Sequence, residues 1–124
     1  MKNSLPACSL PQKAQTRQIL ASRGFRVARI IRGVRTTAYA PGDGHTPGTR
    51  TATGAKARYG VVAVDPGIIR LGTKLYIPGY GFGRALDTGG RIKGKRADLC
   101  YNSVKRAKEH GIKIKDIYVL ERDR

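Results

Sequence analysis

Short apolar segments separated by glycine-rich turns make up most of the chain after residue 24. Hydrophobic and polar positions alternate in these segments, or apolar residues run together briefly, as is typical of β-strands. Strands are predicted within residues 25–40 (as one strand or two), 59–66, 67–81, 82–90, 90–101 and 112–121. Many short strands, glycine turns and few helices favour a closed β-barrel.

Two segments have the features of helices. Residues 102–111 begin with Asn102, a natural N-cap, and end with Gly111, a natural C-cap. Residues 12–23 precede Gly24, which suits the left-handed position after a helix. We therefore predict a mainly β fold with one short helix and an N-terminal helical appendage.

The chain has 124 residues, which is the length of one ordinary domain. We expect residues 1–24 to form the appendage and residues 25–124 to form the barrel domain. No apolar run approaches the roughly 20 residues that a membrane span needs, and the first 24 residues lack the apolar core of an export signal. The sequence therefore predicts no membrane span and shows no export signal.

The charge is strongly one-sided, with 25 lysines and arginines against 8 aspartates and glutamates, for a net charge of +17. The basic residues are spread along the chain rather than gathered in one tail. Such a charge favours an anionic partner, and nucleic acid, an acidic membrane surface and the bacterial cell wall all fit.

Three of the few acidic residues, Asp65, Asp87 and Asp98, end or interrupt apolar strands. Burial beside a strand raises the pKa of a carboxyl group unless donors or cations compensate, and a raised pKa suits a general acid. The alternative is that each aspartate forms a turn by accepting bonds from backbone N–H groups. Local sequence leaves both interpretations open.

The chain resembles the three-aspartate, or 3D, domain of bacterial cell-wall enzymes. The matching stretches are TATG at 51–54, GVVAVDPGIIRLGTKLYIPGYGFGRALDTGGRIKGKRADL at 60–99 and IYVL at 117–120. The domain occurs in the membrane-bound lytic transglycosylase A family and in stationary-phase survival proteins, and Asp65, Asp87 and Asp98 match its three aspartates. The resemblance implies a six-stranded double-psi β-barrel that cleaves peptidoglycan glycan strands, with anionic cell-wall polymers as further partners.

The resemblance also implies a role for each aspartate. Asp98 is expected to be the catalytic acid/base: it protonates the bridging oxygen and then takes a proton from the muramic acid's own 6-hydroxyl, which gives a 1,6-anhydro product. Attack within the substrate replaces the second carboxylate that hydrolysis by water normally needs. Asp87 is expected to orient the sugar or hold up the pKa of Asp98, and Asp65 to anchor backbone amides.

Further candidates for substrate binding come from the matching motifs. They are Thr37 and Tyr39 of a TAY segment, Thr88, Gly89 and Gly90 after the second aspartate, Arg91, and Lys93 of an IKG segment. Thr37 and Tyr39 are equally well explained as ordinary strand residues. Arg91 and Arg70 depart from the family pattern, which has alanine and proline there, and we expect Arg70 to change only a turn.

The remaining titratable residues predict no metal and no cofactor. His45 lies in a polar loop and His110 at a helix end, where a cation suits the helix dipole, and neither is assigned a catalytic role. Cys8 and Cys100 have no histidine near them in sequence, so they are either unrelated thiols or a bridged pair.

Three function classes follow. The first is a lytic transglycosylase at the cell wall or outside the cell (periplasmic in a Gram-negative bacterium). The second is an expansin-like wall binder that keeps the barrel without cleaving glycans. The third is a basic nucleic-acid-binding module, which the net charge favours but which no specific nucleic-acid-binding motif supports.

Overall fold

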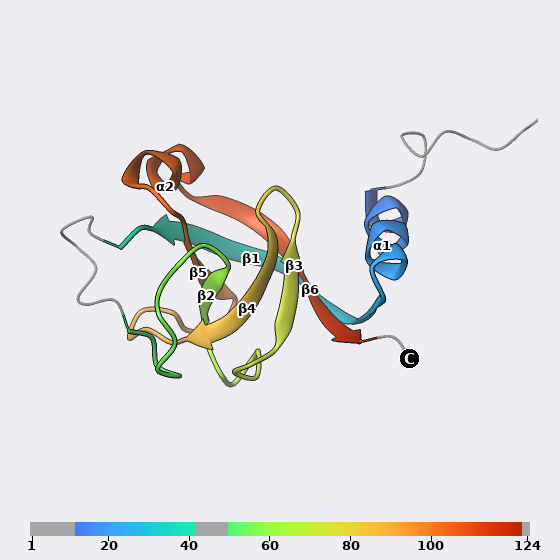
Figure 1. Cartoon of the computed structure of the whole chain (residues 1–124), viewed down its shortest axis with the longest axis horizontal. Helices are drawn as coiled ribbons and strands as arrows, with labels where there is room; N and C mark the ends of the chain where they lie inside the picture. The colour runs from blue at the N-terminus through green and yellow to red at the C-terminus, as the bar shows by residue number, and fades with distance from the viewer. Residues whose placement is uncertain (1–11, 42–49, 123–124) are drawn as a thin grey trace, which may run out of the picture.

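Six strands close into a barrel in the computed structural model, which describes residues 12–41 and 50–122 (Figure 1). Around the barrel the strands follow the order β1-β5-β2-β4-β3-β6. Their bounds are β1 Phe25–Tyr39, β2 Val61–Val64, β3 Lys74–Ile77, β4 Gly81–Asp87, β5 Arg96–Cys100 and β6 Lys113–Arg122. The prediction of a mainly β six-stranded barrel is confirmed.

The barrel is mixed, because β1 pairs with β5 and β2 with β4 in parallel, while the other pairs are antiparallel. Residues 25–39 form a single strand of 15 residues rather than two. Its register against β6 shifts between Val27 and Arg29 and again between Ile31 and Val34. Such bulges bend a strand and increase its twist, which lets one long strand follow the curved wall.

The barrel interior is filled by branched aliphatic side chains. This main core includes Val34, Val62, Val64, Ile69, Leu75, Ile77, Leu99 and Ile117, all less than one tenth exposed. All four residues of β2 are buried, because Val62 and Val64 face this core while the alternate residues are covered on the outside of the wall. The outer face of β2 therefore lies beneath other parts of the chain.

The N-terminal helix α1 (Gln12–Ser22) lies outside the barrel wall, at the end away from α2 (Figure 1). Gly24 follows it with a φ of 82°, as the sequence predicts. Leu20 is completely buried against Tyr118 and Leu120, which belong to a second apolar cluster on the wall. This one leucine, with its neighbours on β6, ties the helix to the barrel.

The short helix α2 (Val104–His110) ends at Gly111, whose φ is 62°. Its N-cap is Ser103, whose side-chain oxygen accepts a bond of 3.2 Å from the backbone N–H of Arg106. The prediction of Asn102 as the cap is wrong by one residue. The chain is still paired at Tyr101, whose N–H donates to the carbonyl of Tyr39, so the helix begins later than the sequence suggests.

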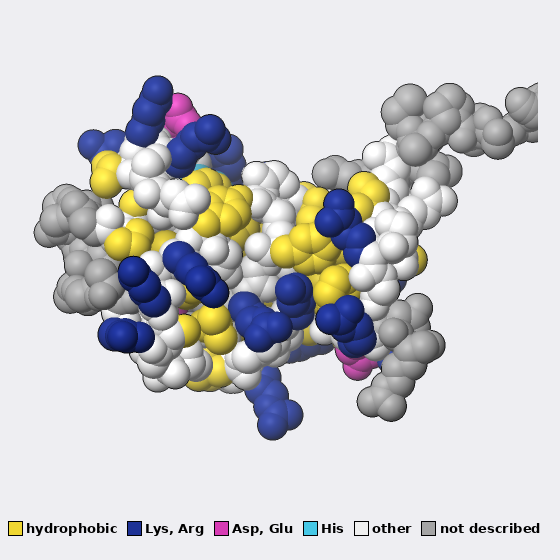
Figure 2. Space-filling view, viewed as in Figure 1, with side chains coloured by type: hydrophobic (Ala, Val, Ile, Leu, Met, Phe, Trp, Pro, Cys, Tyr) yellow, Lys and Arg dark blue, Asp and Glu magenta, His cyan; other side chains and the backbone are white. Residues whose placement is uncertain are grey.

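Lysine and arginine side chains are distributed over the visible face of the molecule, with apolar patches between them (Figure 2). In residues 12–41 and 50–122, neither helix has the length and apolar character that crossing a bilayer would require.

Candidate functional site

The second and third aspartates lie in one row across neighbouring strands. Ala63 on β2 is the register partner of Asp87 on β4 and of Asp98 on β5, and Asp98 is also the partner of Thr37 on β1. Register partners point to the same face of a sheet, and neighbouring strands lie about 4.8 Å apart. Asp98 points to the outer face of the barrel, since Ala97 and Leu99 on either side of it face the core, and a bulge between Val62 and Ala63 brings Asp87 beside the same alanine from β4.

Asp98 lines a pocket of about 270 Å³ on this outer face. The hydroxyl of Thr37 donates a hydrogen bond of 2.9 Å to Oδ1 of Asp98, which fixes the orientation of the carboxylate. The other residues that line the pocket are Arg35, Arg91, Ile92 and Arg96. Of the predicted site residues, the structure thus brings Asp98, Thr37 and Arg91 together.

Asp87 is bound to the backbone of the segment at 51–54. Its Oδ1 accepts bonds of 2.8 Å from the N–H of Ala52 and 2.9 Å from that of Thr88. The backbone N–H and hydroxyl of Thr53 both donate to the carbonyl of Leu86, which fastens the same segment to the end of β4. Asp87 therefore holds a loop beside the row, and it is not among the residues that line the pocket.

Asp65 holds the loop that leads into β5 by accepting a hydrogen bond from its backbone. Its two carboxylate oxygens accept bonds of 2.9 Å from Gly67 N–H and 2.8 Å from Gly94 N–H. The bonds from Gly94 and Gly67, together with the nearby charge of Lys93, lower the pKa of Asp65. Asp65 thus anchors backbone amides, and the raised pKa considered for a strand-end carboxylate is wrong here because donors compensate.

Tyr39 lies two residues beyond Thr37 on β1, with its hydroxyl buried. Among the described residues this oxygen has no nitrogen or oxygen partner, and the polar group that interacts with it is the thiol of Cys100, which is a weak hydrogen-bond partner. Burial raises the pKa of Tyr39, and interactions with Cys100, Asp87 and Asp98 raise it further. The phenol therefore stays neutral beside both carboxylates.

Cys100, for which the sequence leaves open an unrelated thiol or a bridged one, belongs to an apolar cluster together with Tyr39. Its thiol is fully buried, and burial raises its pKa. Its neighbours in this cluster include Val61, Tyr39 and Leu86. Cys8 lies outside the described residues, so the choice between unrelated thiols and a bridged pair stays open.

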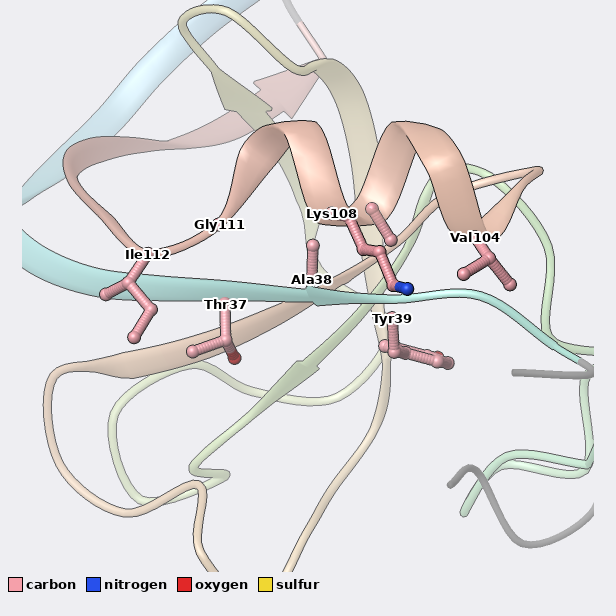
Figure 3. Close-up of a pocket in the computed structure, with 8 residues that line it drawn as sticks. Thr37, Ala38, Tyr39, Val104, Lys108, Gly111 and Ile112 are labelled. Atoms are coloured by element: carbon pink, nitrogen blue, oxygen red, sulfur yellow. The ribbon is translucent and has the colours of Figure 1, made fainter. Parts of the chain in front are cut away.

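A second pocket of about 420 Å³ lies between the end of β1 and α2 (Figure 3). Ala38 points toward the helix, whereas Thr37 and Tyr39 point away from it, and Lys108 and Ile112 reach down to the strand (Figure 3). The pocket is lined by Thr37, Ala38, Tyr39, Val104, Ala107, Lys108, Gly111 and Ile112. Thr37 therefore borders both pockets, which lie on either side of it.

The turn between β4 and β5 contains the remaining candidates. The N–H of Ile92 donates to the carbonyl of Gly89, and a Cβ on Gly89 would come within 2.9 Å of the Ile92 side chain. Gly89 thus allows Ile92 to pack tightly against the turn, whereas Gly90 faces open space. Lys93 lies near Asp65 rather than in the pocket. Sugar contacts by these residues stay predictions.

His110 is buried at the end of α2. One ring nitrogen lies 2.9 Å from the hydroxyl of Thr36 and the other 3.1 Å from that of Tyr101. Burial lowers the pKa of His110, and the charges of Lys113 and Lys115 lower it further. The expectation of a cation at the helix end is wrong, because the ring is enclosed and faces positive charge.

Within residues 12–41 and 50–122, no group of three or more His, Cys, Asp or Glu side chains gathers as a metal site would. The chemical groups of the site are the carboxylate of Asp98 with its fixed orientation, the hydroxyl of Thr37, the buried phenol of Tyr39 and the guanidinium groups of the arginines that line the pocket. This set can move a proton and hold an anion.

Two proteins of Bacillus subtilis are similar to this chain in sequence. The chain is 43% identical over 91 residues to a cell wall-binding protein, YocH, of Bacillus subtilis, a match that covers 70% of this chain and 31% of the relative. It is 32% identical over 123 residues to a putative cell wall shaping protein, YabE, of the same organism, covering 96% and 30%. The chain thus spans about 30% of the length of these relatives.

The crystal structure of MltA from Escherichia coli, a lytic transglycosylase, has a similar fold. The TM-score is 0.51 at 22% identity, over 64% of this chain and 29% of that one. Residues 60–121 match the model of the 3D domain, and the chain belongs to the 3D domain family.

Proposed function

We propose that this chain binds peptidoglycan glycan strands and cleaves them as a lytic transglycosylase, between muramic acid and the following N-acetylglucosamine. The observation that carries the proposal is the placement of Asp98: it lines an outer pocket with its orientation fixed by Thr37. The names of the two Bacillus relatives support the cell wall as the place of action, and with it a location in the wall or outside the cell.

In the proposed reaction Asp98 is the only acid/base. Thr37 holds Oδ1, so the proton that moves is carried by Oδ2. Oδ2 donates this proton to the bridging oxygen as the glycosidic bond breaks. The 6-hydroxyl oxygen of the muramic acid then bonds to its own C1, and its proton passes to Oδ2, which restores the acid. No water is consumed, and the product ends in 1,6-anhydro-muramic acid.

Asp87 and Tyr39 complete the site in this proposal. Asp87 sits one strand beyond Ala63 and fixes the segment at 51–54, so that this segment would meet the substrate in a constant position. Tyr39 lines the pocket on the α2 side of Thr37, where its side chain would contact a sugar. A site held in place before binding gains rate from orientation.

A wall binder without catalytic activity is the second candidate, and the name of the relative YocH favours it. Such a protein would bind glycan strands at the same outer pocket and would leave them intact. A nucleic-acid-binding module has only the net charge of +17 in its favour. Any protein of this charge is retained on DNA at low salt, so DNA binding does not discriminate.

Digestion of purified peptidoglycan, followed by mass spectrometry of the released muropeptides, tests the proposal. We expect 1,6-anhydro ends from the native chain. Asp98→Asn should lower turnover by roughly 10²–10⁴-fold, the usual contribution of general acid/base catalysis, while wall binding stays intact. Asp116→Asn is the matched control, since Asp116 bonds to the N–H of Gly33 on another part of the wall.

The outcomes separate the candidates. Reducing muramic ends would mean that water attacks, which would give Asp87 the role of a second catalytic carboxylate. Binding to peptidoglycan without any released product would make the chain a wall binder. Near-native turnover of Asp98→Asn would refute the assignment of Asp98.

A further inference from the structure

We propose that Arg35, Arg91 and Arg96 form a subsite that binds a carboxylate of the substrate, next to the carboxyl group of Asp98. The carboxylate is the one carried by the acid substituent of the muramic acid unit, either on its lactyl group or on the attached peptide. This inference rests on the proposed substrate class but not on cleavage.

The strand register places two of these arginines side by side. Arg35 on β1 is the parallel partner of Arg96 on β5, just as Thr37 is the partner of Asp98 two residues further along. Residues at i and i+2 share one face of a strand, about 6.6 Å apart along it. The two arginines therefore form a row of positive charge directly beside the row that contains Asp98.

The third arginine comes from the turn after β4. Arg91 lines the same pocket, so three arginines and a single carboxylate, Asp98, line one space. Like charges directly opposite each other on a sheet are destabilising. Three arginines against one carboxylate leave an excess of positive charge, which an anion bound in the pocket would neutralise.

The backbone holds this row in place through Asp65. The carboxylate of Asp65 accepts from Gly94 N–H, and the carbonyl of Gly94 accepts a bond of 2.9 Å from the N–H of Arg96. The N–H of Arg35 donates to the carbonyl of Lys95 at 3.0 Å. The loop that Asp65 anchors thus fixes the backbone of both arginines.

The chemistry and the size of the pocket identify the ligand. A guanidinium group is planar and matches the two oxygens of a carboxylate, with hydrogen bonds strengthened by charge. A space of about 270 Å³ suits a small acid substituent. The pocket on the far side of Thr37 has mainly apolar side chains and one lysine. The acid-bearing sugar therefore lies toward the arginines, and the uncharged neighbouring sugar lies toward α2.

Binding of small ligands tests the subsite without requiring turnover. The full chain is titrated by NMR with N-acetylmuramic acid, its methyl ester, muramyl dipeptide and N-acetylglucosamine. We expect the free acid to bind about tenfold or more tightly than its ester, the size of one charge-assisted hydrogen bond. Arg91→Gln should remove this preference by weakening binding of the acid alone. Arg32→Gln, an exposed change on β1, is the matched control and should keep it.

The other outcomes are equally decisive. Muramyl dipeptide binding more tightly than N-acetylglucosamine, with N-acetylmuramic acid binding no more tightly than its ester, would be one such result. That result would place the bound carboxylate on the peptide and support the subsite. The proposal would be overturned if N-acetylmuramic acid and muramyl dipeptide bound no more tightly than the methyl ester and N-acetylglucosamine. It would also be overturned if Arg32→Gln and Arg91→Gln lost equal affinity for the acid. A retained preference in a chain that releases no glycan product would leave the subsite standing and refute only the lytic activity.

Discussion

Replacement of Tyr39 by phenylalanine should stabilise the protein. The change removes one oxygen atom that is buried and has no nitrogen or oxygen partner in the described part of the chain. The ring stays in the cluster with Val61 and Cys100. The native tyrosine has exchanged its bonds to water for a contact with the thiol of Cys100, which is a weak hydrogen-bond partner.

The size of the effect follows from this loss. Leaving a buried hydroxyl without a partner costs about 1–3 kcal/mol, and the oxygen returns only a small part of that through packing. We expect Tyr39→Phe to raise the free energy of unfolding by about 1 kcal/mol, which for a domain of this size raises Tm by about 3–5 °C. Tyr80 gives the opposite sign, because its hydroxyl accepts from Gly60 N–H at 2.7 Å and donates to the Cys100 carbonyl at 2.6 Å.

Urea and thermal unfolding at neutral pH measure both variants beside Tyr76→Phe, a change at a half-buried tyrosine of β3 that should alter the free energy of unfolding little. Tyr80→Phe should lose about 1–3 kcal/mol. If Tyr39→Phe is instead destabilised by more than about 0.5 kcal/mol, the hydroxyl has a partner and the reasoning fails. A peptidoglycan digestion assay adds a second measurement. A variant that gains stability and loses turnover would indicate that the hydroxyl is kept for the substrate.

Three further predictions concern pH and salt. The pKa of Asp65 is lower in the folded state. Its contribution to stability is therefore present above about pH 4 and is lost as the pH falls further. Asp65→Asn should make the free energy of unfolding, measured in urea, depend less on pH below about pH 4. The pKa of His110 is also lower in the folded state, so folding loses stability as the pH falls below about 6.5, and His110→Gln should flatten that part of the curve. Binding to intact cell walls should weaken as salt rises from about 0.05 to 0.5 M, since screening shortens the reach of exposed charges, and binding that ignores salt would show that the basic surface does not hold the wall.

Local patterns predict most of the elements of this fold. The helix before Gly24 and the helix before Gly111 both end where a glycine takes a positive φ. Each predicted strand segment overlaps an observed strand, because alternation and glycine turns are properties of neighbouring residues. The cap of α2 differs by one residue because pairing of Tyr101 with β1 extends the sheet, a contact between residues far apart in the sequence.

The site is less predictable, since its geometry depends on strand register. The match to a family singles out Asp98, but no local pattern shows that Arg35 lies beside Arg96 or that Asp87 binds Ala52. The buried position of Cys100 beside Tyr39 follows in the same way from the pairing of β5 with β1. Once β1 and β5 are known to pair, the positions two residues before Thr37 and Asp98 identify Arg35 and Arg96.

Two of the three aspartates hold the backbone in place, and the third lines the pocket. Asp65 and Asp87 are fastened to backbone amides of two loops, whereas Asp98 lines the pocket. Both loops therefore keep these attachments when Asp98 is replaced. In the proposed reaction a substitution of Asp98 would remove the acid/base and leave the backbone around the pocket in place, so a catalytic form and a purely binding form of this barrel could differ by one residue.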